Sequence, residues 1–230
     1  MSNQLLPLHN LIAELADRPS TRLVFLSSST VYGNFKSETV SEKDECNPFG
    51  MYAVLKYMGE QLLGEFKAHS NLNFSIVRPS ALYGERCISR RVSQVFLENA
   101  IAGRALVFSG NRDERLDFTY IQDLIQGLIR SGFHERARGE IFNITFGDAQ
   151  PVLKLVDLLR TKFEHIDFTI KPRNQATPLR GTLSNEKAKN LIGFKPEWPL
   201  ERGYLKYIDW YLSRDTSFVF EDTLASPENE

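Results

Sequence analysis

Ser28, Tyr52 and Lys56 are the residues of this sequence whose types and spacing best suit a chemical reaction. Tyr52 and Lys56 lie four residues apart in a predicted helix, and therefore on one face, one turn apart. A tyrosine hydroxyl ordinarily ionises near pH 10, about three units too high for a base at neutral pH, but a nearby ammonium favours the phenolate. A serine hydroxyl can bind an alcohol or its oxyanion. The set suits removal of a hydroxyl proton while a hydride leaves the same carbon.

The Tyr-x-x-x-Lys spacing has a second interpretation, as two neighbours on a helix surface. The chain contains 8 tyrosines, so such pairs also arise by chance, and Tyr32 and Lys36 form another one. Gly33 and Asn34 lie between those two residues and mark a turn, so their side chains need not share a face. The spacing alone does not decide between a site and a surface pair.

Segments of strand and helix character alternate along the chain, which predicts an α/β fold with a largely parallel sheet. Strands are expected at residues 22–28, 73–78, 106–108, 140–146 and 167–171. Helices are expected at residues 2–16, 52–68, 92–101, 121–131, 152–163, 184–192 and 199–212. Ser28 ends the first strand, and open α/β sheets bind ligands at the carboxyl ends of their strands. The expected fold therefore brings Ser28 to the edge where a site would form.

Composition excludes several classes of protein. The formal net charge is -1, which gives no overall field for nucleic acid or anionic membranes, so neither is expected as a partner. Cys46 and Cys87 are too few for a disulfide framework or a four-cysteine zinc site, and they indicate a reducing compartment. The four histidines lie far apart, so no metal site is expected. The sequence has no bilayer-spanning apolar run and no signal-peptide pattern, and a cytoplasmic location is expected.

Six segments of the chain resemble the extended short-chain dehydrogenase/reductases, in the order and spacing of that family. Its members include UDP-sugar 4-epimerases, NDP-sugar 4,6-dehydratases, decarboxylases and reductases, so the resemblance indicates the family and not one activity. The segments are LSSSTVYG, YAVLKYMGEQLL, IVRPSALYGER, ERLDFTYIQDL, EIFNITFG and LRGTLSNEKAKNLIGFKPEWPLERG.

The resemblance implies a role for each residue of the candidate site. Ser28 matches the family's serine or threonine, Tyr52 its catalytic tyrosine, and Lys56 the lysine that also holds the nicotinamide ribose. Pro79 and Ser80 fall where a strand end passes near the nicotinamide. The implied cofactor is NAD, with NADP as an alternative. The implied assembly is a homodimer in which residues 2–16 and 52–68 build a four-helix interface.

The implied substrate is a nucleotide-diphosphate sugar. Ser28, Ser29, Thr30 and Ala81 are the implied substrate contacts on the sheet, and Arg115 and Arg180 fall near positions where the family grips the diphosphate, an anion that an arginine fork suits. Arg115 lies in the mixed-charge run NRDER and is also consistent with a solvated surface, because Leu116 stands where the family's usual arginine would be.

Two departures bear on the reaction and the substrate. The family's dehydratases follow the hydroxyl residue with an acid pair, whereas this chain has Ser29 and Thr30, which cannot do acid–base work at neutral pH. Relatives commonly place an asparagine at position 81 to bond the substrate's phosphates, and alanine cannot do so. The sequence therefore favours an epimerase-like or reductase-like site over a 4,6-dehydratase.

A third departure is an absence. None of the 14 glycines forms the Gly-x-x-Gly-x-x-Gly turn that approaches the dinucleotide pyrophosphate, and the strand at residues 22–28 corresponds to the family's fifth. We therefore expect an N-terminally truncated member that lacks the first strands and the glycine-rich loop. The strand at 22–28 becomes an apolar edge. Such a chain should bind NAD poorly and fold marginally or as an assembly, with a separate N-terminal NAD-binding chain as a conceivable partner.

These observations lead to one domain organisation and one leading function. Residues 1–85 and 120–148 should form a partial Rossmann-type domain, 86–119 and 149–214 a substrate lobe, and 215–230 a disordered acidic tail. The leading function is that of an NAD-dependent sugar-nucleotide 4-epimerase, incomplete without an N-terminal segment. The alternatives are a non-catalytic remnant or split-enzyme subunit, and a dehydratase, decarboxylase or reductase of the same family.

Overall fold

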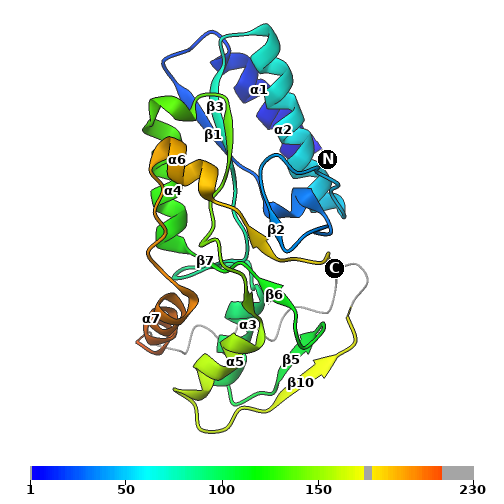
Figure 1. Ribbon diagram of the computed structural model, residues 1–230, viewed down its shortest axis with the longest axis vertical. Coiled ribbons are helices and arrows are strands. Elements are labelled where there is room, and N and C mark those ends of the chain that lie inside the picture. Colours follow the sequence, from blue (N-terminus) through cyan, green and yellow to red (C-terminus); the bar gives the residue numbers. More distant parts are fainter. Residues whose placement is uncertain (1, 174–177, 214–230) are drawn as a thin grey trace.

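Three parallel strands form the main sheet, in the order β1-β3-β8. They are β1 (Arg22–Leu26), β3 (Asn73–Arg78) and β8 (Glu140–Asn143). The structure is a computed structural model that describes residues 2–173 and 178–213. The sheet belongs to the upper of two lobes in Figure 1.

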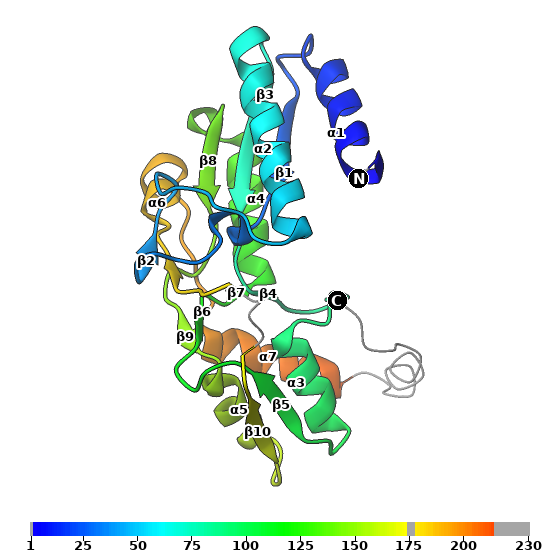
Figure 2. The same ribbon diagram turned by 90° about the vertical axis from the view of Figure 1, so that its right-hand side faces the viewer.

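Helices cover both faces of this sheet because its strands alternate their side chains between the two faces. The pair α1 (Ser2–Leu15) and α2 (Met51–His69) packs on the face that carries Leu23 and Phe25. On the opposite face, α4 (Ile121–Phe133) packs against β1 and β3, and α6 (Glu186–Ile192) packs against β8; Val24 and Phe142 belong to this cluster. Figures 1 and 2 show the two pairs of helices on either side of the strands.

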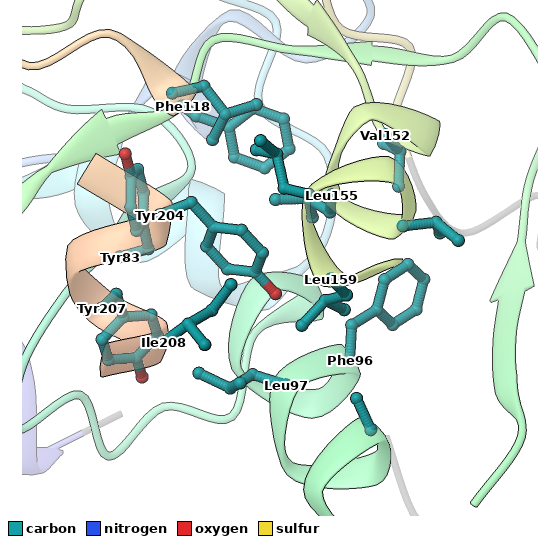
Figure 3. Close-up of a cluster of buried hydrophobic side chains, with 14 of the residues drawn as sticks. Tyr83, Phe96, Leu97, Phe118, Val152, Leu155, Leu159, Tyr204, Tyr207 and Ile208 are labelled. Carbon is teal, nitrogen blue, oxygen red and sulfur yellow. The ribbon is translucent and has the colours of Figure 1, made fainter. Parts of the chain in front are cut away.

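The lower lobe has its own apolar core. It is built from α3 (Val92–Ile101), α5 (Leu153–Arg160) and α7 (Leu200–Leu212), with the parallel pair β5 (Leu106–Ser109) and β10 (Phe168–Lys171) beside them. Figure 3 shows the centre of this core, where aromatic rings from separate segments meet. The Tyr83 ring lies 5.5 Å from that of Tyr120 and 6.0 Å from that of Tyr204, measured between centroids.

Six two-residue strands and two short 3-10 helices complete the described elements. β4 (Leu82–Tyr83) pairs in parallel with β7 (Thr119–Tyr120), and β2 (Thr39–Val40) pairs in parallel with β11 (Thr182–Leu183). β6 (Arg115–Leu116) pairs antiparallel with β9 (Gln150–Pro151). The 3-10 helices are η1 (Ser29–Tyr32) and η2 (Glu135–Ala137).

Each helix and strand expected from the sequence is present, with boundaries that differ by a few residues. The first strand ends at Leu26 because Ser28 already caps η1, and the strand expected at 140–146 ends at Asn143. Helix α6 packs with the three-stranded sheet, although it falls inside the range expected for the substrate lobe. The expected disordered tail at 215–230 lies outside the described residues.

Strand β1 lies at an open edge of the sheet, as the sequence predicts. Within the described residues β1 pairs only with β3, and the Leu26 side chain is 39% exposed. On α4, Ile125, Ile129 and Phe133 recur every four residues and are also exposed. No helix of the described part is long and apolar enough to cross a membrane.

Candidate active site

The residues around Ser28 form a tight turn at the carboxyl end of β1. The Ser28 side chain accepts a hydrogen bond of 3.2 Å from the backbone N–H of Thr30 and so caps η1. The turn ends at Gly33, whose φ is 68°. A Cβ there would lie 2.0 Å from the carbonyl oxygen of Asn47, so only glycine fits. The hydroxyl of Ser28 is thereby fixed by the local backbone.

Tyr52 and Lys56 lie in the first two turns of α2, which begins at Met51 after Gly50. The Lys56 ammonium donates a hydrogen bond of 2.8 Å to the carbonyl oxygen of Leu26, the last residue of β1. The same nitrogen lies 5.8 Å from the centroid of the Tyr52 ring, and Tyr52 is 48% exposed. The fold thus brings the Tyr-x-x-x-Lys pair to the end of the strand that leads into Ser28.

The end of β3 runs beside the Ser28 turn. The backbone N–H of Ser29 donates a hydrogen bond of 2.9 Å to the carbonyl of Pro79. Ser80 is buried, and Ala81 has a φ of 32°, in the left-handed region that an alanine rarely adopts. Pro79, Ser80 and Ala81 therefore line the same end of the sheet as Ser29. Their expected contacts with cofactor and substrate stay predictions.

Arg180 reaches the same place from the far end of the sequence. Its Nη1 donates a hydrogen bond of 2.9 Å to the Ser29 hydroxyl. Burial, and after it the positive charges of Arg91 and Arg173, lower the pKa of Arg180 to about 10. Arg91 and Arg173, from distant segments of the chain, therefore lie near enough to Arg180 to act on its charge, and Arg173 is also ion-paired with Glu114 at 3.1 Å. Such a cluster favours a bound anion, since a ligand's negative charge would relieve their repulsion.

Arg115 lies elsewhere in the lower lobe. Its guanidinium donates a hydrogen bond to the carbonyl of Ala149, and its strand β6 pairs with β9. The arginines that perturb Arg180 are Arg91 and Arg173, which the sequence did not single out. No spacing rule links these three arginines, because only the tertiary fold brings their loops together. The expected role of Arg115 at the diphosphate stays a prediction.

The Ser29 and Thr30 side chains present no acidic group at this site. The Ser29 hydroxyl accepts from Arg180, and the buried Thr30 Oγ1 has no hydrogen-bond partner among the described residues. This agrees with the absence of a dehydratase-type acid pair.

No group of three histidine, cysteine or acidic residues that could hold a metal occurs in the part of the chain that the structure describes. Cys46 and Cys87 are free thiols.

Two buried carboxylates were not singled out by the sequence. Glu60, on α2, forms an ion pair with Arg78 at the end of β3. Asp117 is fully buried in the segment that joins the lobes, and it accepts hydrogen bonds from the backbone N–H groups of Gly147 and Leu183 at 3.1 and 3.0 Å. Burial raises the pKa of Asp117 to about 6. Glu60 could have been found from its position four residues after Lys56, on the same face of α2.

A dinucleotide fits part of this site. The Lys56 ammonium lies at the carboxyl end of β1, beside the ring of the half-exposed Tyr52, and both side chains can bond the hydroxyl groups of a ribose. The pyrophosphate has no glycine-rich turn to bind in the 230 residues.

The comparison with protein families decides the relationship. The model described as the NAD dependent epimerase/dehydratase family matches residues 2–145. This chain belongs to that family. The match covers α1 through β8, including the Ser28 turn and the Tyr52–Lys56 helix, and so confirms the resemblance seen in the sequence.

Known members of the family are similar to this chain at low sequence identity. UDP-glucuronate 4-epimerase 1 of Arabidopsis thaliana is 31% identical in an alignment of 220 positions that covers 86% of this chain and 50% of that relative. The chain thus spans about half the length of this curated relative. The solved UDP-glucuronic acid 4-epimerase of Bacillus cereus, in complex with UDP-glucuronic acid and NAD, superposes with a TM-score of 0.83 at 23% identity, over 91% of this chain and 67% of that one.

A dehydratase has the same fold. The dTDP-glucose 4,6-dehydratase of Bacillus anthracis, in complex with NAD, gives a TM-score of 0.80 at 20% identity, over 91% of this chain and 68% of that one. At such identities the likeness shows the fold alone. The family fold therefore does not choose between epimerase and dehydratase, and the choice depends on the side chains of the site.

Proposed function

We propose that this chain supplies the acid–base and substrate-binding part of an NAD-dependent nucleotide-sugar 4-epimerase. The observation that carries the proposal is the position of Lys56, which joins the end of β1 to the Tyr52 ring beside the Ser28 turn. The hydroxyl side chains of Ser29 and Thr30 favour an epimerase over a 4,6-dehydratase, because they provide no acid–base pair for the loss of water.

Each residue of the site has a distinct task in this proposal. The Tyr52 phenolate accepts the proton of the sugar 4-hydroxyl, and the Ser28 hydroxyl donates a hydrogen bond to the oxygen left behind. The Lys56 ammonium favours the phenolate form of Tyr52 and bonds the cofactor ribose. When bound, NAD supplies the hydride acceptor and donor. Tyr52 returns the proton once the 4-keto sugar has turned over in the site.

The substrate is a sugar joined to a nucleoside diphosphate. Arg180, with Arg91 nearby, would bind the diphosphate, since burial and the charge of Arg91 disfavour the Arg180 cation and a bound anion would offset both; Arg173 is already ion-paired with Glu114. We include Arg115 as a further contact with the diphosphate, on the family resemblance of its position. Similar epimerases are named for UDP-glucuronate or for UDP-glucose, and these two compounds are therefore the first substrates to test.

We further propose that turnover needs a dinucleotide-binding segment in addition to these 230 residues, and that the chain pairs as a homodimer through α1 and α2. Two observations support the first point: no glycine-rich turn occurs in the sequence, and β1 offers an open edge to a further strand. Exposed apolar side chains on α1 and α2, including Leu11, Val54 and Met58, support the second. The open edge equally favours a second candidate, a non-catalytic subunit.

The test measures NAD binding by calorimetry and sugar interconversion by NMR, with and without the N-terminal dinucleotide-binding segment of the Bacillus cereus enzyme as a separate chain. We expect weak NAD binding by the chain alone and turnover in the mixture. Tyr52→Phe should spare NAD binding and lower turnover by about 10²- to 10⁴-fold, the usual contribution of an acid–base group. A mixture that binds NAD but turns over no sugar would favour the non-catalytic subunit.

A further inference from the structure

A buried ion pair joins α2 to the end of β3, close to the residues of the candidate active site. Arg78, the last residue of β3, is 3% exposed, and Glu60, on α2, is 4% exposed. Arg78 donates two hydrogen bonds to the Glu60 carboxylate, from Nε at 2.9 Å and from Nη2 at 2.5 Å. The first bond goes to Glu60 Oε1 and the second to Oε2, so the guanidinium binds both carboxylate oxygens, as in a bidentate arginine–carboxylate pair.

The same carboxylate also binds the end of β1. The Ser27 hydroxyl donates a hydrogen bond to Glu60 Oε1, the oxygen that Arg78 Nε also contacts. One side chain of α2 is therefore bonded to the carboxyl ends of two adjacent strands. A helix anchored at both strand ends cannot rotate or slide without breaking a buried hydrogen bond, which is costly.

The network continues to the third strand of the sheet. The Arg78 guanidinium lies 4.8 Å from the centroid of the Tyr32 ring, and the Tyr32 hydroxyl donates a hydrogen bond of 2.8 Å to Asn143 Oδ1, at the end of β8. Burial alone would lower the pKa of Arg78, but its hydrogen bonds to Glu60 and the attraction of Tyr32 and Glu60 raise that pKa overall. Arg78 thus stays a cation, and all three strand ends are tied together.

The residues of the ion-pair network lie close along the chain to the residues of the candidate active site. Glu60 follows Lys56 by four residues, which puts both side chains on one face of α2, a turn apart. Ser27 immediately precedes Ser28, and Lys56 is bonded to Leu26, one residue before Ser27. Ser28, Tyr52 and Lys56 are therefore each a chain neighbour of a network member or one to two helical turns from it.

We propose that Glu60 and Arg78 are positioning residues, which fix α2 against the ends of β1 and β3 so that Lys56 and Tyr52 face the Ser28 turn. This inference rests on the proposed function for its consequence in catalysis. Its structural content, the placement of Lys56, is independent of any activity. A displacement of about 1 Å at such a site is enough to lower a rate by about 10²-fold.

The experiment compares the whole chain with an apolar triple variant, Ser27→Ala, Glu60→Leu and Arg78→Met. Because the three partners are replaced together, neither a charge of the pair nor the Ser27 hydroxyl is left unpaired, and the Tyr32 hydroxyl keeps its hydrogen bond to Asn143. Such replacements commonly preserve or raise stability. Thermal unfolding checks that the variant folds. Glu140→Gln, which removes the carboxylate of the partly exposed ion pair with Lys187, serves as the control.

The readout is the rate at which lysine amines are dimethylated, followed by mass spectrometry. Lys67 is an internal reference, since it lies on α2 and donates a similar hydrogen bond, of 3.0 Å, to the carbonyl of Gly139. We expect the triple variant to label Lys56 about fivefold faster, the equivalent of one lost hydrogen bond, with Lys67 unchanged. Glu140→Gln should change neither rate.

Equal acceleration of both lysines, or of neither, would overturn the proposal, because the pair would then only stabilise the fold or would not hold Lys56 at all. In the mixture with the dinucleotide-binding segment, the triple variant should lose kcat by at least about tenfold, with little change in the KM for the nucleotide sugar. An unchanged kcat would also overturn it. Absence of turnover in the unaltered chain rejects the proposed function instead, and the labelling rates still decide the role of Glu60 and Arg78.

Discussion

The ammonium of Lys56 donates a hydrogen bond of 2.8 Å to the carbonyl of Leu26, and this contact joins the helix that carries Tyr52 to the strand that leads into Ser28. The same nitrogen lies 5.5 Å from the centroid of the Phe25 ring. Lys56 therefore has two functions that can be separated: it satisfies a backbone carbonyl at the end of β1, and it places a positive charge beside a tyrosine.

The comparison of Lys56→Met with Lys67→Met separates these functions. The loss of one hydrogen bond should lower the free energy of unfolding by about 1 kcal/mol, and the loss of the charge beside Tyr52 should abolish most of the turnover of the reconstituted enzyme. Lys67→Met is the matched control, because Lys67 donates a similar bond to the carbonyl of Gly139 from the same helix. Urea unfolding should give similar losses for both variants. Turnover that falls equally in both would show that Lys56 acts only on the fold.

The long elements were predictable from the sequence because their patterns are local. The apolar run Asn73–Arg78 and the periodic segment Val92–Ile101 have the bounds that the sequence predicts. The two-residue strands, such as Thr39–Val40 and Thr182–Leu183, were not predicted, since a pair of residues has no periodicity and these segments are 143 positions apart at their first residues, from 39 to 182. Only the packing of the lobes brings them together.

The site was predictable to the extent that it lies on one helix and one strand end. Tyr52 and Lys56 share a helical face, and Ser28 follows a buried strand. The pairing of Glu60 with Arg78 and the convergence of Arg91 with Arg180 depend on tertiary contacts that a single sequence does not display. The chemistry of a local motif is thus readable in advance, whereas the side chains that support it are found in the structure.

The arginine cluster predicts opposite effects on stability and binding. Arg180→Met keeps the apolar stem of the side chain but removes a cation that burial and its two arginine neighbours disfavour, so the melting temperature of the ligand-free chain should rise. The affinity for UDP should fall roughly 10- to 100-fold, the value of a charge-assisted hydrogen bond. Differential scanning calorimetry and titration calorimetry measure the two effects, with the exposed Arg112→Met as control. A variant that binds UDP as well as the unaltered chain removes Arg180 from the diphosphate site.

The left-handed backbone at Ala81 predicts that two substitutions raise stability but only one raises affinity. Glycine and asparagine tolerate a φ of 32° better than alanine, so Ala81→Gly and Ala81→Asn should each gain about 0.5–1 kcal/mol in the free energy of unfolding. Ala81→Asn also adds the amide that relatives use toward the phosphates, and it should bind UDP more tightly than Ala81→Gly does. Equal UDP affinities would place residue 81 outside the substrate site.

Asp117 predicts that the stability of the chain falls as the pH rises through the weakly acidic range. Burial raises its pKa from an ordinary value of 3.8 to about 6, so between these values the folded chain binds more protons than the unfolded chain. The stabilising contribution is complete below about pH 4 and is lost as the pH passes about 6. At about 1.4 kcal/mol per pKa unit, the loss between pH 4.5 and 7 is about 2 kcal/mol.

Asp117→Asn tests this pH dependence because the amide cannot ionise. The variant loses one of the two hydrogen bonds to Gly147 and Leu183, since an amide has one acceptor oxygen, and it is therefore less stable at both pH values. Its deficit relative to the unaltered chain should shrink by about 2 kcal/mol from pH 4.5 to 7, because only the unaltered chain must ionise a buried carboxyl. Urea unfolding at the two pH values measures the deficit, and Asp113→Asn, at an exposed carboxylate that does not act on Asp117, should show no such change. A deficit that stays constant or grows with pH would mean that Asp117 is already ionised throughout this range, held as a carboxylate by its two backbone donors.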